Sequence, residues 1–358
     1  MKAKLLNKIA ILSLVITSFS LTTNLPVYAK TDTRAISTAM TGFYNKKGFN
    51  GVVLVAENGK VIYKGANGYA DFKNKVKLTT NSVFNLASVS KQFTAMAIMI
   101  LAERKKLNYQ DNINKYLPGL PYTNITILNL LQHTSGLPDY LDLAEENWDS
   151  EKTITNKDVL DLFKQYKPKV EFKSATKYEY SNTGYAFLAS IVESASGQNF
   201  EKFIQENIFN PLKMTNSYVY NPKTAASRKS PRAYGYSKKF KLDDITYLDG
   251  VVGDGGIYSN VDDLFKWDQA LYTEKLVKLA TLKKAFEQGK LNNGEDFDYG
   301  FGWEVIDENT VYHSGVWAGF RTSISRYRDS KDTVIILTNN SNENTDKVED
   351  KMEKLLGF

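Results

Sequence analysis

The stretch Asn85-Leu-Ala-Ser-Val-Ser-Lys-Gln-Phe-Thr-Ala95 runs directly into the apolar segment Met96-Ala-Ile-Met-Ile-Leu-Ala102. Residues that are apolar on nearly all sides of a helix predict a buried central helix here. Ser88 and Lys91 stand three positions apart at its start, so their side chains share one helix face. The free backbone N–H groups and the positive dipole end of a helix favour negative charge near Ser88. A serine hydroxyl needs a base, and a lysine shielded from water can be neutral enough to serve, so Ser88 is the candidate nucleophile.

Strand-like segments lie at both ends of the chain, and helical segments fill its middle. Residues 51–56 and 60–64 flank Asn58-Gly59, a strong hairpin signal. Further strands are expected at 300–306, 310–313, 320–327 and 333–338. Helices are expected at 33–44, 126–131, 156–166, 184–194, 200–209, 262–271 and 346–356, with Ser259 or Asn260 capping the helix at 262–271.

This order predicts an α+β fold. An antiparallel sheet built from both chain ends would be flanked by helices and would carry an inserted, mainly helical subdomain. We expect the sheet subdomain at about 33–110 and 288–358, and the helical subdomain at about 111–287.

The N-terminal segment has the pattern of a secretory signal. Residues 1–8 are basic, residues 9–21 are apolar, and Val27-Tyr28-Ala29 offers small residues for cleavage. We therefore expect residues 1–29 to be a signal peptide and residues 30–358 to be an exported catalytic domain. A retained anchor is the rival interpretation, although the apolar stretch falls short of the about 20 residues that a membrane helix needs.

Composition excludes several classes of function. The formal charge of +6 is too small and too evenly mixed with acidic residues to indicate nucleic-acid binding. The chain has no cysteine and only two histidines, and it has no His-Glu-x-x-His pattern, so a zinc hydrolase is not expected. A phosphate loop is not expected at Gly253-Asp-Gly-Gly256 either, because the Gly-Lys-Ser/Thr of such loops is missing; a tight turn near the cleft fits better.

The short motifs differ in how specific they are. A second Ser-x-x-Lys, Ser174-Ala-Thr-Lys177, lies in a polar stretch without an apolar helix behind it, and a Tyr-x-Asn pattern occurs at Tyr122, Tyr180 and Tyr258. By contrast, His313-Ser-Gly315 is the only Lys/His-Ser/Thr-Gly triplet in the chain. Its glycine would let a substrate backbone approach a strand edge closely.

With these motifs in their order, the chain resembles the serine beta-lactamase and penicillin-binding protein family, on the branch of class C beta-lactamases, DD-peptidases and related esterases. Ser88-Val-Ser-Lys91 is similar to the first motif, Tyr180-Ser-Asn182 to the second and His313-Ser-Gly315 to the third. Further similar stretches begin at Leu130, Gly255 and Tyr299, so the resemblance covers about residues 33–340.

The resemblance implies a role for each matching residue. Ser88 would attack the carbonyl, Lys91 would take or steer its proton, and Tyr180 would act as a phenolate or proton relay. Asn182, His313, Ser314 and Gly315 would bind substrate, and the backbone N–H groups of Ser88 and Val316 would form the oxyanion hole. The resemblance implies neither a metal nor a cofactor. His313 stands where classical beta-lactamases carry lysine, and a histidine there would have a pH-dependent charge.

The expected function is an exported serine hydrolase or acyl-transferase that forms an acyl-enzyme at Ser88. The leading substrate class is D-alanyl groups of the cell wall, as in a D-alanyl-D-alanine carboxypeptidase, in a Gram-positive envelope. A teichoic-acid D-alanyl esterase, a carboxylesterase and a class C-like beta-lactamase remain open, because they share the catalytic core and differ in cleft loops such as 139–148 and 228–249. A non-catalytic envelope-binding protein is a more remote alternative.

Two other readings are less favoured. An alpha/beta-hydrolase requires a Gly-x-Ser-x-Gly elbow, and no serine here has glycines at both flanking positions. The imidazole of His133 is expected to bond backbone groups at a loop and not to take part in catalysis.

Overall fold

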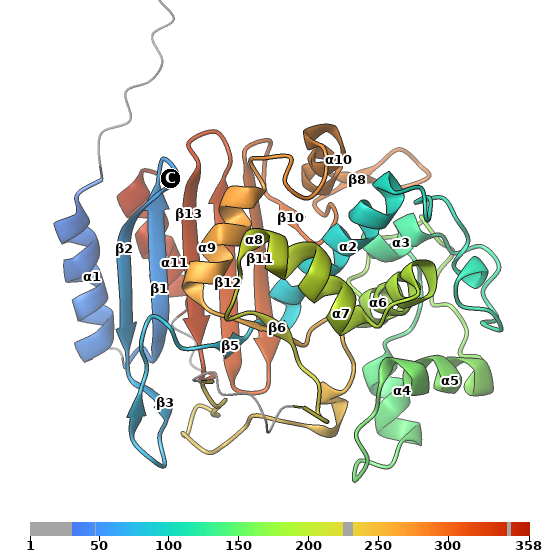
Figure 1. Cartoon of the computed structure of the whole chain (residues 1–358), viewed down its shortest axis with the longest axis horizontal. Coiled ribbons are helices and arrows are strands. Elements are labelled where there is room, and N and C mark those ends of the chain that lie inside the picture. The colour runs from blue at the N-terminus through green and yellow to red at the C-terminus, as the bar shows by residue number, and fades with distance from the viewer. Residues whose placement is uncertain (1–30, 47, 225–231, 342–344) are drawn as a thin grey trace, which may run out of the picture. The chain divides into compact units, whose positions relative to one another are not determined.

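The structure is a computed structural model that describes residues 31–46, 48–224, 232–341 and 345–358 (Figure 1). Residues 32–358 form one compact unit. The predicted signal peptide, residues 1–29, lies outside the described residues. Within the described ranges, no helix combines the length and the apolar character that crossing a membrane requires.

A six-stranded antiparallel sheet joins the two ends of the chain. Its order is β10 (Glu304–Val305), β11 (Thr310–Trp317), β12 (Phe320–Tyr327), β13 (Asp332–Thr338), β1 (Gly51–Glu57) and β2 (Lys60–Asn67). The β1–β2 hairpin turns at Asn58 and Gly59, which have φ angles of 52° and 70°. Two consecutive positive φ angles are what a two-residue hairpin needs, so the Asn-Gly prediction is confirmed. Because β1 pairs with β13, the predicted α+β fold is confirmed as well.

Helices cover both faces of this sheet. On one face, α1 (Thr33–Lys46) and α11 (Thr345–Leu356) pack side by side, as Figure 1 shows in blue and red. Alternate residues of a strand point to opposite faces, so Val53 and Val55 of β1 contact this helix pair. Val52 and Leu54 belong instead to the larger core on the other face.

That larger core is built around α2 (Lys91–Glu103), which is buried from Lys91 to Leu101. The predicted buried central helix is thus confirmed. It packs against α6 (Asn182–Ser196), α7 (Phe200–Ile204) and α10 (Leu279–Lys283). The other helices are α3 (Ile127–Leu131), α4 (Tyr140–Asn147), α5 (Asn156–Tyr166), α8 (Asn210–Leu212) and α9 (Val261–Ala270), and the short strands are β3 (Tyr69–Asp71), β4 (Val76–Lys77), β5 (Phe84–Asn85), β6 (Tyr218–Val219), β7 (Ile257–Ser259), β8 (Gly289–Lys290) and β9 (Asp296–Phe297).

Three expected elements differ from the structure. The strand expected at 300–306 shrinks to β10, because Gly302 (φ 75°) turns the chain against the start of α2, where a Cβ would lie 2.8 Å from the Lys91 carbonyl oxygen. The helix expected at 200–209 leaves α-helical geometry after Ile204 and continues as a π-helical turn, Gln205–Phe209. Residues 140–147, expected as part of a loop, form α4, whose N-cap is Asp139.

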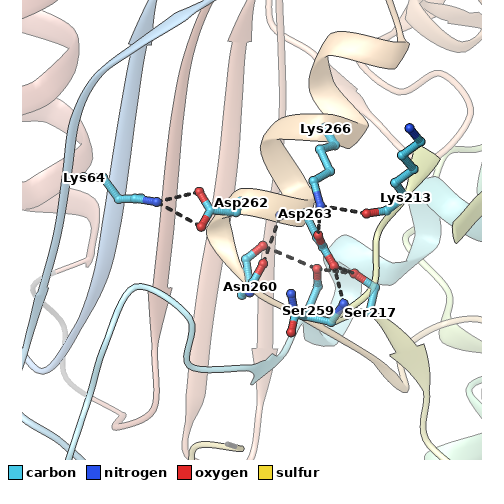
Figure 2. A network of polar contacts seen from close by, with 9 residues as sticks. Lys64, Lys213, Ser217, Ser259, Asn260, Asp262, Asp263 and Lys266 are labelled. Carbon is cyan, nitrogen blue, oxygen red and sulfur yellow. Dashed lines mark hydrogen bonds and ion pairs between the residues drawn. The ribbon is translucent and has the colours of Figure 1, made fainter. Parts of the chain in front are cut away.

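A polar network fixes the start of α9 against the sheet (Figure 2). Asn260 caps the helix by accepting the Asp263 N–H at 2.9 Å, which selects one of the two predicted caps. The buried Asp263 carboxylate accepts from the Ser217 hydroxyl at 3.0 Å and from the Lys266 ammonium at 2.7 Å. We call these residues, with Ser259, Asp262 and its partner Lys64, the α9 network.

Candidate active site

Ser88 lies in a single 3-10 turn, η1 (Ala87–Ser90), between β5 and α2. Ala87 holds a left-handed φ of 49°, which is uncommon for a residue with a Cβ. Surrounding contacts fix this conformation: the Asn85 side chain accepts the Ala87 N–H at 2.9 Å, and the Thr322 hydroxyl donates to the Leu86 carbonyl at 2.7 Å. Backbone strain of this kind persists only where neighbours determine it, and here it presents Ser88 at the start of a long helix.

Lys91 is fully buried, and its ammonium group has three acceptors. It donates to the Ser88 hydroxyl at 3.1 Å, to the Asn182 side-chain carbonyl at 2.9 Å and to the Asp254 backbone carbonyl at 2.8 Å. None of these acceptors carries a charge. Burial therefore lowers the pKa of Lys91 to about 8, although the carboxylates of Asp254 and Asp139 act in the opposite direction.

Tyr180 and Asn182 come from the start of α6. The Lys91 ammonium lies 4.8 Å from the centre of the Tyr180 ring, and the phenol also interacts with the Ser88 hydroxyl. About 40% of the Tyr180 surface is exposed, yet partial burial of the phenol raises its pKa above the usual value, as does the nearby Asp254 carboxylate. A neutral phenol therefore faces Ser88, and of the two roles expected for Tyr180 the proton relay fits better than the phenolate.

His313 is a buried, neutral imidazole. Its Nε2 shares a hydrogen bond with the Tyr299 hydroxyl at 2.9 Å, and its Nδ1 lies 2.6 Å from the Ser314 carbonyl oxygen. Burial and the nearby Lys91 ammonium lower the pKa of His313 to about 3. The pH-dependent charge expected from the sequence is therefore absent at neutral pH, because the pKa of the ring lies far below 7.

The rest of the third motif lies on β11, with one departure from expectation. Ser314 and the exposed Val316 line the same cleft as Ser88. Gly315 faces the opposite way: a Cβ there would lie 2.4 Å from the Leu86 carbonyl oxygen. The glycine thus allows β11 to pack on the η1 turn, whereas the sequence led us to expect close approach of a substrate.

The outer edge of β11 is open beside the cleft. Strand β10 pairs with β11 only through Val311 and Tyr312, so the edge from His313 onward has no neighbouring strand among the described residues. An unpaired edge can bind an extended peptide through main-chain hydrogen bonds.

Several cleft residues have no motif that could have identified them. Asp249, Glu304 and Trp317 line the cleft, and Asp249 accepts a hydrogen bond from the Trp317 indole at 3.1 Å. Asp254 also lines it and sits in the turn predicted at residues 253–256, where its glycine neighbours were a usable signal. No group of three or more metal-ligating side chains is present in the described part of the chain.

His133 supports the site from behind. Its Nδ1 accepts the Ser181 N–H at 3.1 Å, which confirms the expected backbone bond. Its ring lies 4.3 Å from the Tyr180 ring, centre to centre, and contacts Tyr185 and Tyr299 as well. Burial holds the pKa of His133 well below its usual value, so this ring acts as an uncharged wall for Tyr180.

Comparison with known proteins finds relatives over most of the chain. The chain is 43% identical over 310 residues to penicillin-binding protein 4* of Bacillus subtilis, covering 82% of this chain and 69% of that protein. It is 30% identical to the putative penicillin-binding protein PbpX of the same organism, covering 88% and 78%. The crystal structure of a penicillin-binding protein from Bacillus halodurans superimposes with a TM-score of 0.77 at 26% identity, covering 89% of this chain and 98% of that one.

The family model described as Beta-lactamase matches residues 34–357. The chain therefore belongs to the beta-lactamase family and is a serine hydrolase of the kind that includes the penicillin-binding proteins.

Proposed function

We propose that the protein is an exported serine hydrolase that forms an acyl-enzyme at Ser88 and acts on D-alanyl groups of the bacterial cell wall. The observation that carries this proposal is the setting of Lys91. It is fully buried, bonded to the Ser88 hydroxyl and surrounded by uncharged acceptors, so its pKa lies near 8. A base poised near the working pH is what activation of a serine needs.

In the proposed acylation, neutral Lys91 takes the proton from the Ser88 hydroxyl as the oxygen attacks the substrate carbonyl carbon. The negative charge that develops on the carbonyl oxygen is held by the N–H groups of Ser88 and Val316, close to the start of α2. The tetrahedral intermediate then expels its leaving group, which takes a proton through the Tyr180 phenol from Lys91.

In the proposed deacylation, a water molecule attacks the acyl-enzyme carbonyl. Tyr180 and Lys91 take its proton and return one to the Ser88 oxygen, which releases a free acid. Asn182 contributes by position, since its carbonyl holds Lys91 and its amide contacts Asp139 at 3.3 Å. His313 contributes shape and not charge.

Two classes of substrate are compatible with this chemistry. A D-alanyl-D-alanine peptide is the substrate expected from the sequence, and the similarity to penicillin-binding proteins of Bacillus supports it. A D-alanyl ester of a wall polymer is the second candidate. It is favoured by one observation: the described residues that line the cleft include no arginine or lysine to pair with a substrate carboxylate.

Covalent labelling tests the proposal. A fluorescent penicillin and a fluorophosphonate should each label the wild-type protein, and neither should label Ser88→Ala. The variant Ser174→Ala, in the second Ser-x-x-Lys sequence, is the matched control and should label like wild type. Absence of label with both probes, in protein that melts cooperatively, would instead support the non-catalytic binding protein.

Export is tested separately. The first residue of the protein recovered from the culture medium of its host should follow Ala29. A chain that stays with the membrane and begins at Met1 would contradict cleavage and would support the anchor.

A further inference from the structure

The charge of the cleft is the strongest feature that the catalytic proposal does not use. Asp249, Asp254 and Glu304 are among the residues that line the cleft together with Ser88. The described lining residues supply no arginine or lysine, His313 is neutral, and Lys91 is buried behind Ser88. A cleft lined by one sign of charge concentrates substrates of the opposite sign.

Two of these carboxylates lie near opposite ends of β11. Gly315, between Tyr312 and Trp317, packs against the turn that carries Ser88. Glu304 pairs with Tyr312 on one side, and Asp249 accepts from the Trp317 side chain on the other. Strand residues rise about 3.4 Å each, so Tyr312 and Trp317 lie roughly 17 Å apart. Elements next to both ends of β11 thus contribute an acidic residue to the cleft that contains Ser88.

The three carboxylates differ in how far the protein satisfies them. Asp254 accepts from the Tyr140 hydroxyl at 3.0 Å, and Asp249 accepts from the Trp317 indole and the Thr246 N–H. The Glu304 carboxylate receives no hydrogen bond or ion pair from any residue that the structure describes. Its negative charge nevertheless contributes to raising the pKa of the Tyr180 phenol. A half-buried carboxylate in the same cleft as Ser88 and Tyr180 is thus left for the substrate.

We propose that the cleft prefers acyl donors that carry a free ammonium group and disfavours leaving groups that carry a free carboxylate, with Glu304 as the residue that determines this specificity. The substrate class is D-aminoacyl esters of neutral alcohols. This inference rests on the proposed acyl-enzyme at Ser88. The Ser88 oxygen forms a bond to the acyl carbon, the ester C–O bond breaks, and the alcohol leaves with the proton. Water then releases the free D-amino acid.

Three small esters test the charge preference of the wild-type protein. D-alanine methyl ester carries an ammonium, N-acetyl-D-alanine methyl ester lacks it, and D-alanyl-D-lactate adds a carboxylate to the leaving group. Hydrolysis is followed at pH 7 as kcat/KM, with the rate in Ser88→Ala subtracted as background. One charge acting across a partly hydrated cleft changes affinity by about tenfold. We therefore expect D-alanine methyl ester to exceed each of the other two by about tenfold.

Variants at Glu304 assign the preference to this residue. Glu304→Gln should bring the ratio between the amino and N-acetyl esters close to one, and Glu304→Lys should invert it. Glu308→Gln removes the same charge from an exposed position outside the cleft and should keep the wild-type ratio. Melting curves of the variants show whether the fold is retained. The ratio of kcat/KM for the amino ester to that for the N-acetyl ester is formed separately for each variant, so a general loss of activity does not change it.

The outcomes separate the two proposals. Turnover that depends on Ser88 but is equal for the three esters, or fastest for D-alanyl-D-lactate, overturns the charge preference and leaves the acyl-enzyme intact. An unchanged ratio in Glu304→Gln removes Glu304 from the proposal. Failure of Ser88 to react with any ester or acylating probe overturns both.

Discussion

The α9 network and the cluster of Ser88, Lys91, Tyr180 and Asn182 both bring serine, lysine and carboxamide groups together, yet they differ in what faces the lysine. In the α9 network the ammonium of Lys266 meets the carboxylate of buried Asp263, and 41% of the Lys266 side chain remains exposed (Figure 2). In the Ser88 cluster the ammonium of Lys91 is fully buried and donates only to uncharged oxygens. A paired lysine stays charged and holds structure, whereas a buried lysine without a contacting anion can give up its proton.

The same comparison explains the second Ser-x-x-Lys sequence. Lys177 forms an ion pair with Glu179 on the surface, and both side chains are largely exposed. Its ammonium is therefore solvated and paired. The three-residue spacing alone does not turn a lysine into a base. Burial at the start of α2 does so for Lys91, because it lowers the pKa of the ammonium group.

The largest expected effect comes from replacing the buried lysine. Lys91→Met keeps the volume and removes the base, so the rate at which a fluorescent penicillin acylates Ser88 should fall by about 1,000-fold. Lys266→Met removes a lysine from the α9 network and should leave that rate within twofold. Equal losses in the two variants would show that the comparison between the clusters is mistaken.

The next effect is on stability. Asp263 is completely buried and accepts from the Asn216 N–H at 2.7 Å as well as from Ser217 and Lys266. Asp263→Asn turns an amide group toward some of these donors, so we expect the free energy of unfolding to fall by about 2 to 3 kcal/mol. Urea unfolding measures this loss. The acylation rate of the folded variant should not change, and a rate lowered more than tenfold would indicate that the network acts on the site.

Much of this arrangement is visible in the sequence. Patterns of neighbouring residues predict the Asn-Gly hairpin, the buried helix after Ser88 and the strands at both ends of the chain. These patterns do not depend on contacts between distant segments. For the N-cap of α9 the sequence leaves Ser259 and Asn260 open, because serine and asparagine accept a backbone N–H about equally well. The structure selects Asn260 by its 2.9 Å bond.

Other features depend on contacts between distant segments. Glu304 and Asp249 lie on separate elements, and no spacing predicts that they share a cleft with Ser88. The orientation of Gly315 depends on β11 packing against Leu86, more than two hundred residues earlier. The neutral state of His313 follows from burial, which the isolated motif does not reveal.

A moderate effect is expected from pH. If neutral Lys91 is the base, the fraction of active protein rises with pH until the pKa near 8 is passed. The acylation rate at low substrate should therefore increase about tenfold per pH unit below 8 and level off above it. A profile that falls between pH 6 and 8 would contradict this role.

The carboxylate of Asp254 provides a second test of this pH profile. The Asp254 carboxylate raises the pKa of Lys91, opposing the effect of burial. Asp254→Asn removes that charge while the backbone carbonyl still accepts from Lys91. The midpoint of the profile should therefore move to lower pH. A midpoint that moves upward, with the fold intact, would show that another group controls the profile.

The smallest effect is expected where the α9 network reaches solvent. Lys64 and Asp262 form an ion pair at 2.7 Å, but their side chains are 32% and 36% exposed. Water and salt screen such a pair, so Lys64→Met, Asp262→Asn and the double variant should give a coupling energy below about 1 kcal/mol. Asp262 also lies in the first turn of α9, where a negative charge interacts with the helix dipole, so Asp262→Asn should cost slightly more than Lys64→Met. Urea unfolding at low and high salt measures both differences. A coupling of 2 kcal/mol or more would mean that the pair behaves like buried Asp263, and that solvent exposure does not separate the edge of the network from its centre.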